Sequence, residues 1–128
     1  MAAFSDYLEA AILDATLRNT SYTSPTTCYL ALYTSNPGDD NSGTECSGTN
    51  YARQSAAFNR TNATASNSGN ITFPTAGSGG WGTITHFGVL DAVSSGNLLY
   101  HGALTASKAI TEGDVFRVES GQLDITLA

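Results

Sequence analysis

The stretch WGTITHFGVLDAVSSGNLLYHGALT, from Trp81 to Thr105, carries the clearest structural pattern in the chain. Its first half alternates between two faces, which is the period of a β-strand. The polar run Ser94–Asn97 supplies a turn, and residues 96–105 return as a second strand. We therefore predict an antiparallel hairpin. The predicted strand 81–92 places Ile84, His86, Gly88 and Leu90 on one face and Thr83, Thr85, Phe87 and Val89 on the other.

Shorter strand signals lie on both sides of this hairpin. Residues 26–34 alternate, with Cys28, Leu30 and Leu32 on one face and Tyr29, Ala31 and Tyr33 on the other, before the turn Asn36-Pro37-Gly38. Regular spacing of about seven short strands predicts a mainly β fold, an antiparallel β-sandwich or a jelly-roll-like arrangement. The other predicted strands are 51–58, 70–73, 115–118 and 122–127, with loops at Gly38–Asn50 and 75–80 and an exposed connection or weak edge strand at Asn59–Gly69.

The first residues show the only helical period. Apolar side chains recur every three or four residues from Phe4 to Leu17, and Ser5 or Asp6 can cap the first exposed amides. We expect a helix over about residues 4–18, with its apolar stripe covering one end of the sandwich. The β region then runs over about residues 26–128, and the length of 128 residues suits one domain spanning 1–128.

Charge is scarce and acidic. Only 12% of residues are charged, the net charge is −6, and the five basic residues are scattered along the chain. Nucleic-acid binding needs a basic patch, so we expect no nucleic-acid partner. Apolar runs are too short to cross a bilayer and the N-terminus lacks a signal-peptide layout, so we expect a soluble protein without a membrane partner and without Sec export.

Residues that could carry chemistry do not form a recognisable set. His86 and His101 fall on the two strands of the predicted hairpin, where a weak metal site is conceivable but structural hydrogen bonding is favoured. The acidic loop Asp39–Glu45 resembles a calcium loop without the EF-hand spacing, and a solvated turn is the favoured interpretation. We therefore expect no enzyme, no catalytic residue, no metal ligand and no cofactor.

Aromatic side chains offer a second kind of candidate. On alternating strand positions they belong more often to a core than to a sugar-binding surface, because each buries a large area. Cys28 and Cys46 could form one disulfide, but two reduced thiols fit a protein made and assembled in a bacterial cytoplasm at least as well. The aromatic residues concerned are Tyr29, Tyr33, Tyr51, Trp81 and Tyr100.

Taken together, the chain resembles a family of small tailed-bacteriophage virion proteins, variously described as head decoration (cement), minor tail or tail fibre proteins. The resemblance covers nearly the full length and implies a particle component without catalytic residues. The segments that carry it are Met1–Glu9, Tyr29–Thr34 followed by Asn36-Pro37, Tyr51–Gln54, Trp81–Gly88 and Leu98–Leu104.

The resemblance leaves two roles open on the virion. Fibres usually contain coiled-coil, β-helical or collagen-like repeats, and this sequence has none, which favours a homo-oligomeric capsid decoration protein, a dimer or trimer bound to the major capsid protein on the outside of the shell. The alternative is a tail fibre or minor tail component, an adaptor or receptor-binding tip, whose partners are other tail proteins or a host surface glycan. The predicted contact segments are Met1–Tyr7, Gly38–Asn50 and Asn59–Gly69.

Overall fold

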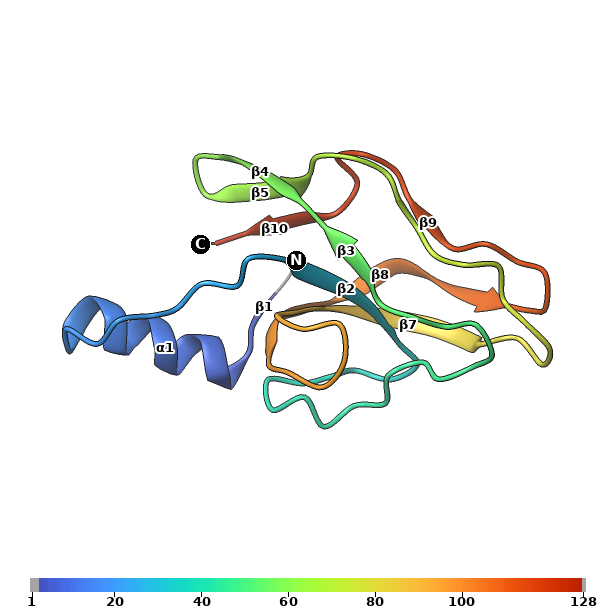
Figure 1. The fold of residues 1–128 in the computed structure, drawn as a ribbon, viewed down its shortest axis with the longest axis horizontal. Helices are drawn as coiled ribbons and strands as arrows, with labels where there is room; N and C mark the ends of the chain where they lie inside the picture. The colour runs from blue at the N-terminus through green and yellow to red at the C-terminus, as the bar shows by residue number, and fades with distance from the viewer. Residues whose placement is uncertain (1–2, 128) are drawn as a thin grey trace.

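The fold, a computed structural model that describes residues 3–127, is built from antiparallel sheets and one helix (Figure 1). This confirms the predicted mainly β architecture. The five-stranded sheet has the order β1 (Ala3–Phe4), β8 (Leu98–Ile110), β7 (Gly82–Leu90), β2 (Cys28–Tyr33) and β3 (Gln54–Ala56). The three-stranded sheet has the order β10 (Asp124–Thr126), β5 (Thr64–Asn67) and β4 (Phe58–Thr61), and a two-stranded sheet joins β6 (Ile71–Thr72) to β9 (Arg117–Val118).

The main core lies between the five-stranded sheet and the two smaller ones. Leu30 and Leu32 of β2 face it from one layer, and Ile71 and Ile125 face it from the other. In Figure 1 the smaller sheets lie along one side of the large sheet, so their apolar faces meet. The other buried members of this core are Cys46, Ala56, Phe73, Ala76, Trp81, Ile84, Phe87, Val89, Ile110, Phe116 and Leu123.

Strand β2 is buried on both faces. Ala31 and Tyr33 point away from the main core and form a second cluster with Leu90 and Leu98. The two faces of β2 are those that the alternation of residues 28–33 predicts. Gly88 permits this second cluster, because a Cβ there would lie 2.8 Å from the ring of Tyr33.

The predicted hairpin forms, but one of its residues lies on the opposite face from the prediction. β7 and β8 pair antiparallel, and β8 continues five residues beyond the predicted end at Thr105, to Ile110. A register shift between Ile84 and His86 reverses the alternation, so Ile84 joins Phe87 and Val89 in the main core. The prediction that Ile84 shares a face with His86 is therefore wrong.

The register shift also places extra residues on β8. Ile84 pairs with Lys108 whereas His86 pairs with Ala103, so β8 bulges between these two positions. Strand β1 pairs with β8 only at Tyr100 and His101. Among residues 3–127, no strand pairs with the outer edge of β8 beyond these two residues.

The helix α1 (Asp6–Leu17) starts later than predicted. Phe4 lies in β1 rather than in the helix, and Ser5 is the N-cap whose side chain accepts a hydrogen bond from the Leu8 amide, 3.1 Å away. Ser5 also donates to the carbonyl of Leu98, which fixes the start of the helix on β8. No described helix is long and apolar enough to cross a membrane.

The helix does not cover one end of the sandwich as predicted. Leu8 is its one buried residue, and Figure 1 shows α1 extending beside the sheets rather than over them. Its start is held by the bond from Ser5 to Leu98 and by the bond from the Asp6 amide to the Asp39 carbonyl. The apolar residues further along α1, Ile12, Leu13 and Leu17, are exposed.

The prediction for residues 51–69 needs two corrections. The expected strand 51–58 is divided at Ala57, where the chain passes from β3 in the large sheet to β4 in the three-stranded sheet. The expected connection 59–69 instead forms the paired hairpin β4–β5, and Asn62 adopts the positive φ of 54° that its turn requires.

Asn67 at the end of β5 joins three segments. Its side-chain nitrogen donates to the carbonyls of Gly69 and Glu119 at 2.8 and 2.9 Å, and its side-chain oxygen accepts from the Leu123 amide at 2.9 Å. The residue is buried, so these bonds form away from water. These hydrogen bonds hold the segment that leads into β10 against the end of β5.

Replacing Asn67 with Ala should lower the free energy of unfolding by about 2–4 kcal/mol, because three backbone groups lose their partner in a buried place. Urea unfolding of the purified protein measures the change. Ser68→Ala, at the exposed neighbouring position, is the control and should change stability by less than about 0.5 kcal/mol. Equal effects of the two substitutions would contradict this role of Asn67.

Candidate functional site

Loop 38–50 is held to the body by a partly buried ion pair. The Arg53 guanidinium donates to both carboxylate oxygens of Glu45, each at 2.8 Å, and its Nη1 donates to the carbonyls of Ala92 and Ser95 at 2.9 and 2.8 Å. Tyr51 Oη donates to Glu45 at 2.7 Å and accepts from the Leu32 amide. One arginine thus links the loop, the start of β3 and the turn between β7 and β8.

These contacts and burial shift the pKa values of the groups around Glu45. Hydrogen bonds to Glu45 raise the pKa of Arg53, and burial followed by the hydrogen bond to Glu45 raises the pKa of Tyr51. Burial also raises the pKa of Tyr33 to about 12. The Arg53 guanidinium is therefore charged and both tyrosines are neutral in the fold at neutral pH.

The side-chain oxygens of the predicted calcium-like loop bind separate partners. Asp39 Oδ1 lies 2.8 Å from Nε2 of His101, Asn41 Oδ1 accepts from the Tyr33 hydroxyl, and Glu45 binds Arg53. Their oxygens do not converge on one point within the loop. The loop is exposed at Asp39, Asp40 and Asn41, as a solvated turn would be, although Asp39 and Asn41 also bond to His101 and Tyr33 of the body.

Three carboxylates do meet at the start of α1. One oxygen each of Asp6, Glu9 and Asp39 lie within 4.8 Å of one another, and all three residues are exposed. The positive end of the helix dipole and the His101 ring beside Asp39 reduce the repulsion between these negative charges. The cluster is explained by the docking of loop 38–50 against the helix, since the Asp6 amide donates to the Asp39 carbonyl.

The two histidines have different roles. His101 pairs with Gly88 in the hairpin register and His86 pairs with Ala103, so the rings are not opposite one another. His86 Nδ1 lies 2.8 Å from Thr85 Oγ1, while His101 is buried and binds Asp39. Both rings therefore serve hydrogen bonding, the interpretation that the sequence favoured.

The aromatic candidates lie inside rather than on a surface. Trp81 is buried and its Nε1 donates to the Thr49 carbonyl at 2.8 Å. Tyr51, Phe73 and Trp81 contact one another through their rings, and Tyr33 is also buried. Tyr29, Tyr51 and Tyr100 are half-buried, so these residues offer no flat exposed platform for a sugar.

Both cysteines are free thiols, which leaves the disulfide hypothesis without support. Cys46 is buried with its Sγ 3.9 Å from the Trp81 carbonyl, and Cys28 is half-buried at the start of β2. Burial raises the pKa of both thiols. The raised pKa lowers the thiolate fraction of each cysteine at neutral pH.

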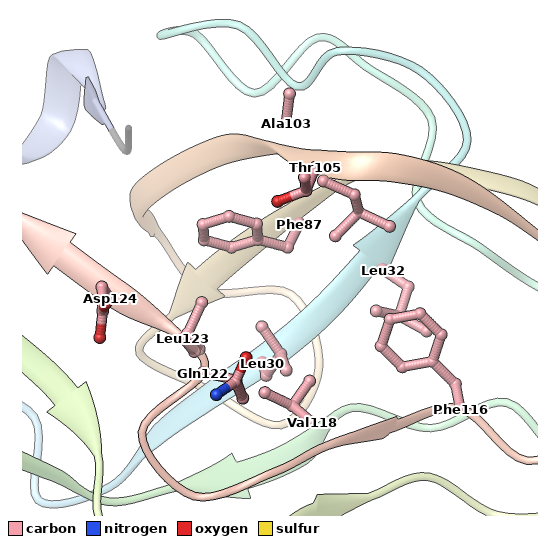
Figure 2. A pocket seen from close by; sticks show the side chains of 11 residues that line it. Leu30, Leu32, Phe87, Ala103, Thr105, Phe116, Val118, Gln122, Leu123 and Asp124 are labelled. Carbon is pink, nitrogen blue, oxygen red and sulfur yellow. The ribbon is translucent and has the colours of Figure 1, made fainter.

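Two open grooves lie between the layers. The first, which we call the polar-rimmed groove, has a volume of about 210 Å³. Figure 2 shows Leu30, Leu32 and Phe87 on one wall and Phe116 and Val118 on the other. The remaining lining residues are Ala103, Leu104, Thr105, Gln122, Leu123 and Asp124, of which Thr105, Gln122 and Asp124 are polar.

The second groove, which we call the apolar groove, has a volume of about 260 Å³. It lies where β2, β7 and β8 face the three-stranded sheet, and Arg60 is the one charged residue in its lining. Mostly apolar side chains such as these bind a partner by removing apolar surface from water rather than through reactive groups. Its lining is Cys28, Phe58, Arg60, Asn62, Ala63, Ala65, Val89, Leu99, Tyr100, Ile125 and Leu127.

Comparison with known families identifies the kind of protein. Residues 3–126 match the family described as podophage GP4 fiber I protein gp80. The chain belongs to this family. No curated protein matches the chain.

Membership of the gp80 family confirms the resemblance to tailed-phage virion proteins. It makes the chain a structural component of a phage particle, and the match spans both sheets and the helix. The grooves and the exposed residues of the helix are surfaces that the fold leaves open. Sequence reasoning missed the grooves, because they form only where two sheets of distant segments meet.

Arg53→Lys should lower the free energy of unfolding by about 2–3 kcal/mol. Lysine keeps the charge but cannot make the paired contact with Glu45 and still reach Ala92 and Ser95. Denaturant titration provides the measurement. Arg117→Lys is the control, since its pair with Glu119 is exposed and should contribute less than about 0.5 kcal/mol. A similar loss in both variants would contradict the importance of the partly buried pair.

Stability should fall at alkaline pH. Tyr33 holds its proton more tightly in the fold, so its contribution is complete below pH 10 and is lost as the pH rises through about 12. The free energy of unfolding should drop by about 1.4 kcal/mol per pH unit over this range for Tyr33 alone. Urea titrations at several pH values measure the slope. Tyr33→Phe should reduce this slope, and an unchanged slope would contradict the assignment.

Proposed function

We propose that the chain is a non-enzymatic building unit of a fibre on the outside of a tailed-phage particle, acting as one domain. The family description over residues 3–126 supports a fibre role. The observation that carries the non-enzymatic part is that the candidate chemical groups are engaged in structural contacts. His101, Asp39 and Glu45 each bind a side chain of the fold.

A rigid and weakly charged body suits this role. The chain has a net charge of −6 but few charged groups in total, so burying its surface against another protein requires little desolvation. Its long loop is fixed by Arg53 and His101 rather than left free. Such a unit transmits force between neighbours without deforming, which is what a fibre needs.

Capsid decoration is the second candidate. The observation that favours it is the lack of coiled-coil, β-helical or collagen-like repeats in a chain of this length. In that role the partner is the major capsid protein, and loop 38–50 and the hairpin within residues 59–69 are contact segments. Of the predicted contact segment Met1–Tyr7, the first two residues lie outside the described part of the structure. In the fibre role the partners are other tail proteins, and a host surface glycan is a possible target of the tip.

Immunogold labelling and cryo-electron microscopy of intact particles distinguish these roles. We expect the label on fibres, and we expect a phage lacking the protein to adsorb poorly to its host while keeping normal heat resistance. Supplying the protein from a plasmid should restore adsorption. Label over the whole shell, together with DNA loss at lower temperature in the deletion phage, would replace the fibre role with capsid decoration.

A further inference from the structure

Helix α1 presents an apolar stripe to solvent on the side opposite its buried residue. Leu13 and Leu17 are one helical turn apart and are 55% and 77% exposed, whereas Leu8 on the opposite face is 4% exposed. Four of the seven large exposed hydrophobic residues of the described chain lie in this helix, namely Tyr7, Ile12, Leu13 and Leu17. A stripe of this kind on a protruding helix marks a contact with another protein.

The apolar groove is the complementary surface on the same molecule. The half-buried Phe58 and Tyr100 line it nearer the solvent, and the buried Val89 and Ile125 line it on the core side. The side chains of Leu13 and Leu17, about 6 Å apart along the helix axis, can enter a groove of about 260 Å³. The polar-rimmed groove fits the stripe less well, because Thr105, Gln122 and Asp124 would be left without partners.

Charge also matches between the helix and the groove. Within α1 the charged residues are Asp6, Glu9 and Asp14, so the helix is purely acidic. Glu9 lies one turn before Leu13 and therefore borders the same stripe. The groove carries the single charge of Arg60, whose Nη1 reaches only the Asn62 carbonyl. Two copies with a net charge of −6 each repel one another, so a contact between them needs local attraction of this kind.

We propose that α1 of one copy packs into the apolar groove of a second copy, with Leu13 and Leu17 buried in the groove and Glu9 beside Arg60. The partner is thus another molecule of this chain, wherever on the particle the protein stands. This inference does not depend on the fibre role and can be tested on the purified protein.

The contact must be reciprocal to be stable. A helix of 12 residues is about 18 Å long, and one face of it buries much less than the roughly 1,200 Å² of a standard interface. If each copy gives its helix and receives another, a closed dimer or ring contains two or more such contacts. A two-fold dimer places two such contacts in one interface, so we expect a closed homo-oligomer rather than an open chain of copies.

The first test compares oligomeric state by analytical ultracentrifugation. The full-length protein should form a dimer or a larger closed oligomer, and Leu13→Ser with Leu17→Ser should give a monomer with an unchanged far-UV spectrum. The matched control is Val93→Ser with Val115→Ser, which removes two other exposed apolar side chains and should leave the oligomer intact. A monomeric wild-type protein, or an oligomer that survives loss of both leucines, would overturn the proposal.

The second test reverses the charges. Glu9→Lys and Arg60→Glu should each weaken association at least tenfold, and the double variant should recover most of the lost affinity because the pair is restored with opposite signs. Lysine at position 9 also lies beside Asp6 and Asp39, so the fold tolerates it. Absence of recovery in the double variant would contradict the pairing of these two residues.

The third test uses the native Cys28 in the groove lining. Leu17→Cys should form a disulfide with Cys28 of another copy under mild oxidation, seen as a covalent dimer or ladder on a non-reducing gel. Adding Cys28→Ser should remove that product, and Val93→Cys should not form one with Cys28. A disulfide that joins position 17 to Cys28 within one chain, or one that persists without Cys28, would exclude this arrangement.

Discussion

Burial of both faces of β2 is the constraint from which the rest of the structure follows. Leu30 and Leu32 on one face and Ala31 and Tyr33 on the other are almost completely hidden from solvent. A sheet buried on both sides needs a cover on each. The smaller sheets cover the first face, and loop 38–50 with the turn between β7 and β8 covers the second. The ion pair between Arg53 and Glu45 holds loop 38–50 in place over that second face. Arg53 is one of only five basic residues in the chain.

The sequence correctly predicted the structural features that depend on residues close together in the chain. The faces of β2, the hairpin β7–β8 and the cap at Ser5 follow from alternation and from helix-end chemistry, and the structure contains them. Ile84 was placed on the wrong face because a bulge depends on how two strands pair, which periodicity does not record. The hairpin β4–β5 was missed because its Asn, Ser and Thr residues are typical of loops, and Asn67 holds it through partners up to 56 residues away.

The exposed face of α1 and the two grooves could not be predicted from the sequence. Sequence analysis assigned Leu8 and Ile12 to one apolar stripe that covers the sandwich, whereas the structure buries Leu8 and exposes Ile12, Leu13 and Leu17. Contacts with the body hold the start of the helix, where Ser5 bonds to Leu98, Asp6 bonds to Asp39 and Leu8 is buried. The grooves depend on the separation of two sheets.

The bulge in β8 has a consequence for how copies of the chain can meet. An open strand edge can pair with the edge of a neighbour, and repeated pairing of this kind produces endless sheets. Along the outer edge of β8, the bulge between Ala103 and Lys108 and the lysine charge interrupt a straight run of backbone donors and acceptors. The bulge therefore disfavours sheet extension from one copy to the next through this edge of β8.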